Sequence, residues 1–182
     1  PGTLSSLPAA ELAAGWVEVL KTALIAGGGL WERVAAGEEA DEHMILACAR
    51  TKLAVVAADE RDVGLRQVLN LGHTVGHAIE TVTGYARYRH GEAVGLGLLA
   101  ALRLSEREDL RARVRELLLA RGLPVTLEGA GVEVEQIVAA TARDKKRLGA
   151  RVPFVLVRAP GEVATGQKVA DGDLRAAVAE LF

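Results

Sequence analysis

Three of the four histidines in this 182-residue chain lie within eighteen positions of one another, from His73 to His90. His73 and His77 are four residues apart, so a helix would present both imidazoles on one face. His90 stands at the expected start of the following helix, and it reaches the same point if the two helices pack antiparallel. Three imidazoles, or two imidazoles and a carboxylate, can hold a divalent metal such as Zn²⁺ and leave a position open for substrate.

Histidines at this spacing also occur on helix faces that simply contact solvent. The glycines of the region weigh against that alternative, because Gly72, Gly76 and Gly91 each stand next to one of the three histidines. A glycine lets another backbone or a ligand come close to the helix. The sequence therefore favours a metal site over a solvated face.

Glu18 and Lys21 lie one helical turn apart in a mostly apolar stretch, AAGWVEVLKTALI. Charges on or beside a buried stripe cost free energy unless they are paired or bound to a ligand. Two interpretations stay open from this segment alone. The two residues form a local ion pair on the exposed side of the helix, or Glu18 is an oxygen ligand of the metal and Lys21 binds an anion.

Further polar side chains are candidates for the same site. Arg66 lies one turn before Asn70, and Asn70 lies one turn before the first of the histidines, so a helix would direct them all to one face. Lys52, Lys145 and Lys146 are the other candidates, although each is also explained as a surface charge or a charged helix end. A metal surrounded by lysine and arginine indicates an anionic substrate.

The spacing of apolar residues predicts the helices that position these side chains. We expect helices over 8–25, 30–37, 39–58, 64–83, 92–104, 108–121 and 134–145, and a last helix that begins with Asp171 or Asp173 as its cap and ends at Phe182. Ser6 is the expected cap of the first helix, the glycines at 27–29 should interrupt the chain after it, and Gly84 should end the fourth.

Two of these helices carry more specific expectations. The helix over 39–58 has closely spaced apolar residues and is expected to be mostly buried, with Cys48 in the core. The helix over 92–104 contains glycines, which predicts close approach of a neighbouring backbone and would also allow packing against a partner chain. A homodimer is expected.

Strand-like sequence appears only late in the chain, at 152–157 and 162–169, and predicts a hairpin around Pro160 and Gly161. The predicted fold class is therefore a mainly α, bundle-like single domain over residues 1–182 with a small late β hairpin.

Composition excludes several classes of protein. A formal charge of −2 and a pI of about 6.1 do not fit a nucleic-acid-binding protein. Cys48 is the only cysteine, which excludes an internal disulfide and fits a reducing compartment. No segment has the length and apolarity of a membrane span or the pattern of a signal peptide, so a cytoplasmic location is expected. The chain begins at Pro1 and its only methionine is Met44, which fits either initiator removal or a chain that begins inside a larger protein.

Four motifs in order resemble the C-terminal helical domain of the 3-dehydroquinate synthase family. They are AGWVEVLK at 14–21, ADERDVGLRQVLNLGHTVGHAIE at 58–80, HGEAVGLGL at 90–98 and RDKK at 143–146. The resemblance implies a phosphate lyase of the shikimate pathway. It converts 3-deoxy-D-arabino-heptulosonate 7-phosphate to 3-dehydroquinate by transient oxidation with NAD, phosphate elimination, re-reduction and aldol closure, and it uses Zn²⁺ or Co²⁺.

The same resemblance assigns roles to the candidate residues. It implies metal ligands at Glu18, His73 and His90, substrate contacts at Lys21, Lys52, Arg66, Asn70, His77, Lys145 and Lys146, and catalytic roles for His77, Lys21 and Lys146. Spacing alone would make His77 a ligand together with His73, whereas the family pattern makes His77 a proton carrier at the substrate. We adopt the family assignment.

One half of the family pattern has no counterpart in this chain. The family's N-terminal half is a dinucleotide-binding domain, and no strand followed by a glycine-rich turn and helix occurs here. NAD is therefore expected on an N-terminal domain that lies on another chain or on a longer form of this one. The alternatives are a related sugar-phosphate cyclase that makes an inosose or a valiolone, and a non-catalytic helical interaction domain.

Overall fold

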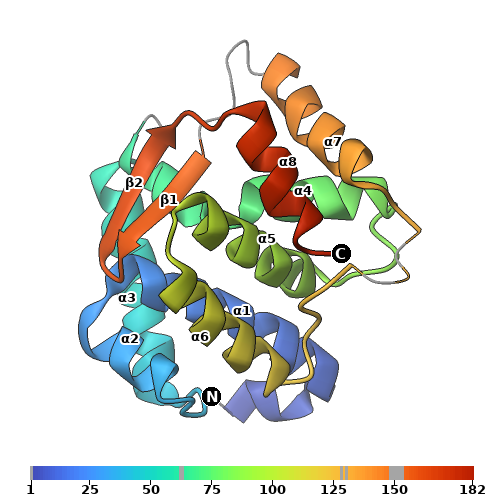
Figure 1. Ribbon diagram of the computed structural model, residues 1–182. Helices are drawn as coiled ribbons and strands as arrows, with labels where there is room; N and C mark the ends of the chain where they lie inside the picture. Colours follow the sequence, from blue (N-terminus) through green and yellow to red (C-terminus); the bar gives the residue numbers. More distant parts are fainter. Residues whose placement is uncertain (1, 62–63, 128, 130, 148–153) are drawn as a thin grey trace.

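The protein is a helical domain with one β hairpin, and a computed structural model describes residues 2–61, 64–127, 129, 131–147 and 154–182, without the side chains of Thr3 and 142–147. Its elements are η1 (Gly2–Ser6), α1 (Ala9–Ala26), α2 (Gly28–Ala35), α3 (Glu42–Ala58), η2 (Leu65–Asn70), α4 (His73–Val82), α5 (His90–Leu104), α6 (Glu108–Leu119), α7 (Val134–Arg147), β1 (Phe154–Ala159), β2 (Glu162–Gln167) and α8 (Asp171–Ala179) (Figure 1). The predicted mainly α fold class with a late β hairpin is confirmed.

Helix α5 lies at the centre of the domain, with α1, α4, α6, α8 and β1 packed around it (Figure 1). Gly91 and every residue from Ala93 to Leu102 are buried, so the helix is covered on every side. A helix that is apolar all round is typical of a core element rather than a surface one. The expectation that this helix could pack against a partner chain is therefore wrong, because its own domain covers it.

Glycines allow α5 to sit this close to its neighbours, as the sequence predicts. A Cβ atom on Gly97 would overlap the carbonyl oxygen of Gly72, and one on Gly91 would overlap the carbonyl oxygen of Ala14. The contact of Gly76 with Ala93 and Val94, taken with that of Gly72 with Leu98, shows that α4 and α5 run antiparallel.

The first helices follow the prediction except at their ends. Pro8, not Ser6, is the cap residue of α1, and no side chain caps that end. Of the three glycines, only Gly27, with φ of 66°, lies between α1 and α2, because the next two glycines belong to α2. The hairpin explains this break: a Cβ on Gly27 would lie 2.7 Å from the carbonyl oxygen of Pro160, and the backbone N–H of Gly161 donates to the Leu24 carbonyl at 2.9 Å.

Helix α3 begins after Asp41, whose carboxylate accepts a hydrogen bond from the Met44 backbone N–H at 2.8 Å. The prediction that this helix is mostly buried is wrong. Met44 is its one fully buried residue, and Leu53 is 68% exposed. Apolar composition alone could not show which neighbours the helix has within the described domain.

The predicted continuous helix over 64–83 is also wrong. A 3₁₀ segment, η2, ends at Asn70, and α4 begins at His73 after a break at Gly72. Gly72 has φ of 77°, in the left-handed region that favours glycine. The end of α4 agrees with the prediction, because Gly84, which has a positive φ, directly follows the C-terminal cap residue Thr83.

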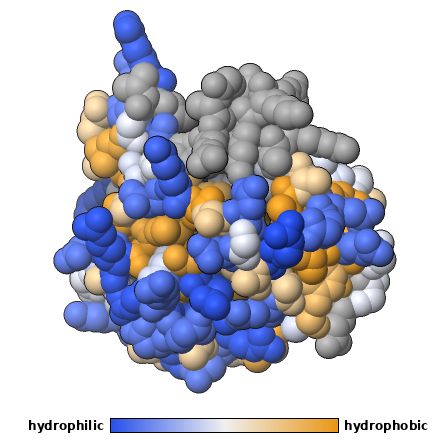
Figure 2. Space-filling model, turned by 45° about the horizontal axis from the view of Figure 1, so that its top comes forward, coloured by the Kyte–Doolittle hydropathy of each residue, from blue (hydrophilic) through white to orange (hydrophobic). Residues whose placement is uncertain are grey.

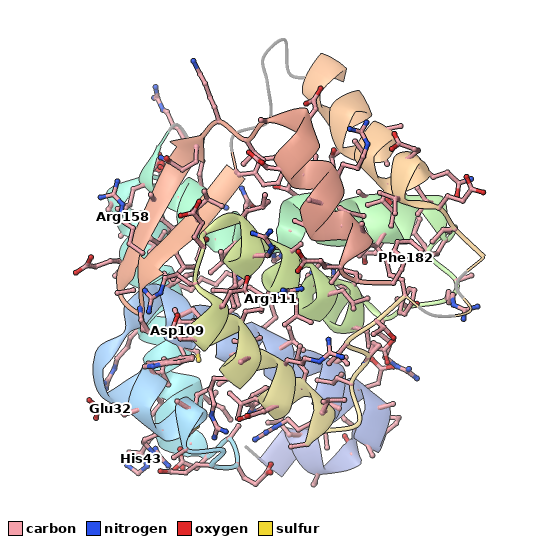
Figure 3. The ribbon with its side chains drawn as sticks, viewed as in Figure 1. Glu32, His43, Asp109, Arg111, Arg158 and Phe182 are labelled. Atoms are coloured by element: carbon pink, nitrogen blue, oxygen red, sulfur yellow. The ribbon has the colours of Figure 1, made fainter. Side chains whose placement is uncertain are left out.

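The chain ends in the hairpin and α8. Strands β1 and β2 pair antiparallel, as predicted. Neither Asp171 nor Asp173 caps α8, because the cap residue is Ala170 and no side chain caps the helix. Arg111 of α6 donates to Glu180 at 2.6 Å and so ties α6 to the chain end near Phe182 (Figure 3).

The surface is mixed rather than dominated by one kind of side chain. Figure 2 shows hydrophobic surface interrupted by hydrophilic side chains on the face that it presents. No helix among the described residues is long and apolar enough to cross a membrane.

Candidate metal and substrate site

The antiparallel packing of α4 on α5 brings three imidazoles together. The ring centroids of His73 and His77 are 5.2 Å apart, those of His73 and His90 are 5.2 Å apart, and those of His77 and His90 are 5.8 Å apart. One ligand atom from each ring lies within 4.8 Å of the others. The expected convergence of the histidines on one point is therefore confirmed. His43, the fourth histidine, lies exposed at the start of α3, beside Asp41 (Figure 3).

Helix α1 adds a carboxylate to this cluster. Glu18 Oε1 lies 3.9 Å from His73 Nε2, while its Oε2 forms an ion pair with Lys21 Nζ at 2.7 Å. Oε1 is a buried atom without a hydrogen-bond partner among the described residues. A buried oxygen left unpaired costs free energy, and a bound cation would satisfy it. The three imidazoles, with the Glu18 carboxylate beside His73, therefore offer nitrogen and oxygen donors that fit a divalent metal ion.

Two of the three imidazoles are oriented by a hydrogen bond at Nδ1. His73 Nδ1 lies 3.1 Å from the Leu71 carbonyl oxygen, and His90 Nδ1 lies 3.1 Å from Glu80 Oε1. Since both partners are acceptors, each Nδ1 carries the proton and each Nε2 keeps a lone pair. The His77 ring makes no hydrogen bond to the described residues, which distinguishes it from the other two histidines.

Charges in the site favour the forms that bind metal. Burial and the nearby Lys21 ammonium lower the pKa of His73 to about 4, so this imidazole is neutral at pH 7. Burial opposes ionisation of Glu18, but the charge and hydrogen bond of Lys21, together with the nearby His73 and His90, hold the pKa of Glu18 below its usual value. A neutral imidazole and an ionised carboxylate are the states that ligate a cation.

A pocket of about 600 Å³ opens beside these residues and holds most of the predicted substrate contacts. Its lining includes Glu18, Lys21, Lys52, Arg66, Asn70, His73 and His90. Lys21 is only 6% exposed, whereas Lys52 is exposed on α3. The lining combines two of the clustered histidines and Glu18 with three cationic side chains, an arrangement suited to a small anion with hydroxyl groups.

Arg66 and Asn70 reach the pocket by a route that the sequence prediction did not foresee. They lie on η2 rather than on the helix that carries the histidines. The buried Asp59 carboxylate fixes this segment, because its Oδ2 accepts from the backbone N–H groups of Gly64 and Arg66 at 2.8 and 3.0 Å. The guanidinium of Arg66 also donates to the Glu60 carbonyl at 3.0 Å.

Some predicted residues are not brought together in the pocket. His77 does not line it and lies exposed beside the other two imidazoles. The side chains of Lys145 and Lys146, at the end of α7, lie outside the described residues.

Sequence reasoning missed two residues of this region. Cys48, predicted as core, is half-buried and lines the pocket, and burial raises the pKa of its thiol. Glu80 is buried at the end of α4, and the signal that could have revealed it is an acidic residue in the otherwise apolar run after His77.

Solved structures of sugar-phosphate cyclases share this fold. The chain aligns over its full length with 54% of a 2-epi-5-epi-valiolone synthase from Streptomyces hygroscopicus, described with NAD⁺ and Zn²⁺ bound, at 24% identity and a TM-score of 0.79. It also aligns with 54% of a 2-deoxy-scyllo-inosose synthase complexed with carbaglucose-6-phosphate, NAD⁺ and Co²⁺, at 21% identity and a TM-score of 0.77. The chain therefore has the fold of about half of such a cyclase.

Sequence comparison narrows this class to one family. The family described as 3-dehydroquinate synthase C-terminal matches residues 15–147, and the chain belongs to it. A 3-dehydroquinate synthase from Leptospira interrogans is 39% identical over 171 residues, which cover 87% of this chain and 46% of the relative. One from Desulforamulus reducens is 36% identical over 191 residues, which cover 98% and 53%. The chain thus spans about half the length of these curated relatives.

Proposed function

We propose that the chain is the metal- and substrate-binding half of a 3-dehydroquinate synthase. Such an enzyme converts 3-deoxy-D-arabino-heptulosonate 7-phosphate to 3-dehydroquinate and phosphate. The observation that carries this proposal is the pocket in which Glu18, His73 and His90 stand beside Lys21, Lys52 and Arg66. The relatives at 36 and 39% identity, which bear the name of this enzyme, support it.

The three proposed ligands would hold Zn²⁺ or Co²⁺ through Glu18 Oε1 and the Nε2 atoms of His73 and His90. Such an ion would lower the pKa of substrate hydroxyl groups and so prepare them for oxidation by NAD. Lys21 keeps Glu18 ionised and holds one of its oxygens at 2.7 Å, so that the other oxygen faces the histidines.

The cationic residues bind the substrate in this proposal. Lys21, Lys52 and Arg66 hold its carboxylate and phosphate groups, and the Asn70 amide orients its hydroxyl groups. We assign proton transfer to His77, because its exposed imidazole lies beside the proposed ligands yet is free of the hydrogen bonds that orient them. Lys145 and Lys146 remain proposed substrate contacts, and Lys146 a proposed catalytic group, on the family pattern alone.

The NAD-binding half is a proposed partner. The described residues contain a two-stranded antiparallel sheet and no parallel strand–helix–strand unit that would bind a dinucleotide. The site in this chain does not fit NAD, and we infer that the cofactor is held by an N-terminal domain. The chain alone is therefore expected to be inactive. A homodimer and a cytoplasmic location complete the proposal.

The test is to combine the chain with an NAD-binding half taken from a relative, add Zn²⁺, NAD and the heptulosonate phosphate, and measure phosphate release. We expect cofactor-dependent release of phosphate, with 3-dehydroquinate as the product identified by chromatography and mass. Release of phosphate with an inosose or valiolone-type product from its own substrate would instead assign a related cyclase. A combination that binds both metal and NAD but releases no phosphate would favour a non-catalytic helical domain.

The ligand and proton-transfer roles are separated by two variants in this assay. His73→Ala should lose both metal and activity. His77→Ala should keep the metal and lose about 100-fold or more in rate, since positioned acid–base groups contribute about 10² to 10⁴. Loss of metal from His77→Ala would contradict the assigned roles.

A further inference from the structure

Glu80 is a buried carboxylate that the proposed reaction does not use directly. It lies on α4, and its side chain is only 9% exposed. Removing a carboxylate from water costs several kcal/mol unless a partner compensates for it. Among the described residues, the side-chain partner of Glu80 is His90, whose Nδ1 lies 3.1 Å from Glu80 Oε1.

This contact controls the chemistry of His90. A carboxylate can only accept a hydrogen bond, so Nδ1 must donate and the proton is fixed on that nitrogen. Nε2 is then left with its lone pair, and the ring is held near His73 and His77. A histidine that ligates a metal commonly uses its second nitrogen in this way.

His90 needs such a partner more than His73 does. The His90 side chain is 49% exposed and begins α5 directly after a loop, whereas the His73 side chain is 14% exposed. The surrounding protein and the Leu71 carbonyl hold His73, but the exposed ring of His90 would adopt several rotamers and both tautomers without Glu80.

We propose that Glu80 is a positioning residue that fixes the tautomer and orientation of His90 and thereby sets the affinity of the chain for a divalent metal. This inference rests on the proposed metal site. Glu80 itself does not touch the metal. Its negative charge behind the ring also makes Nε2 a stronger donor than a backbone carbonyl would.

The test compares Glu80→Gln with Glu92→Gln in the full 182-residue chain. Glu92 is the matched control: it lies near the start of α5, where it accepts hydrogen bonds from Arg89, but no hydrogen bond or ion pair joins it to the histidines among the described residues. Zn²⁺ affinity is measured by competition with a chromophoric chelator. The His90 tautomer is read in the metal-free chain from long-range ¹H–¹⁵N correlations of its ring.

We expect Glu80→Gln to weaken Zn²⁺ binding by about 10- to 100-fold, the range found when such partners are removed. The Gln amide can either accept from Nδ1–H or donate to a bare Nδ1, so His90 should change from the pure Nδ1–H tautomer to a mixture. Glu80→Asp, which keeps a carboxylate, should recover part of both properties. Glu92→Gln should leave affinity and tautomer as in the unaltered chain.

Unchanged Zn²⁺ affinity and tautomer in Glu80→Gln would overturn the inference, as would an equal loss of affinity in Glu92→Gln. The tautomer measurement uses no metal. It therefore separates failure of this inference from failure of the proposed function. If only the proposed function fails, the unaltered chain binds no metal, but Glu80→Gln still changes His90 from one tautomer to a mixture.

Discussion

Replacing Gly97 with alanine should separate the two helices that carry the histidines. The added Cβ would overlap the carbonyl oxygen of Gly72 and lie 2.9 Å from the backbone nitrogen of Gly76. Both neighbours are backbone atoms, so no side chain can rotate away. Overpacking of this kind costs about 1 to 3 kcal/mol. A clash with backbone atoms should cost an amount at the upper end of this range, and the better helix propensity of alanine offsets about 1 kcal/mol of it.

The expected net loss is therefore about 2 kcal/mol in the free energy of unfolding, or a Tm lower by about 4 to 8 °C for a chain of this size. Urea and thermal unfolding followed by circular dichroism measure it. Gly15→Ala in α1 is the matched control, because a Cβ there meets nothing within 4 Å. It should raise stability by about 0.5 to 1 kcal/mol. A Gly97→Ala variant as stable as the unaltered chain would refute the close packing of α4 on α5.

Three further predictions concern the pocket. Lys21→Met should lower the free energy of unfolding in urea by about 1 to 3 kcal/mol, because it leaves the partly buried carboxylate of Glu18 without its cation. The pKa of His73, about 4 when folded against 6.5 for the free group, means that the unfolded chain binds more protons between these pH values. Stability of the metal-free chain should therefore fall as pH decreases from 6.5 towards 4, and His73→Gln should reduce this fall in Tm. Arg66→Ala should weaken binding of the heptulosonate phosphate by about 10- to 100-fold in calorimetry, since hydrogen bonds to charged groups contribute about 1.5 to 3 kcal/mol. Exposed Arg50, outside the pocket lining, serves as the control, and an equal effect of Arg50→Ala would contradict the assignment.

The histidine cluster could be predicted because its causes are local. The spacing of His73 and His77 and the short connection to His90 leave an antiparallel helix pair as the simple solution, and the glycines mark where the helices touch. The pairing of Glu18 with Lys21 could also be predicted. The sequence could not show whether the pair faces solvent or the site, since an ion pair one turn apart forms equally well on either face of a helix.

Other features depend on contacts that the sequence does not display. The break at Gly72 interrupts an apolar pattern that continues on both sides, and the tight contact with Leu98 of α5 accompanies the turn there. Leu53 has the same hydrophobicity whether a neighbour covers it or not, so the exposure of α3 could not be predicted. Glu80 was missed because its partner, His90, follows only after the chain has reversed direction.

Metal content is the most direct test of the central claim, that Glu18, His73 and His90 of this chain form a divalent metal site. The chain and its single-residue variants are loaded with Zn²⁺, dialysed, and analysed by mass spectrometry of the metal. We predict about one Zn²⁺ per unaltered chain, as expected for one site with three protein ligands, retention in His77→Ala, and loss in Glu18→Ala, His73→Ala and His90→Ala. An unaltered chain that holds no metal, or a His77→Ala variant that loses it while Glu18→Ala retains it, would contradict the claim.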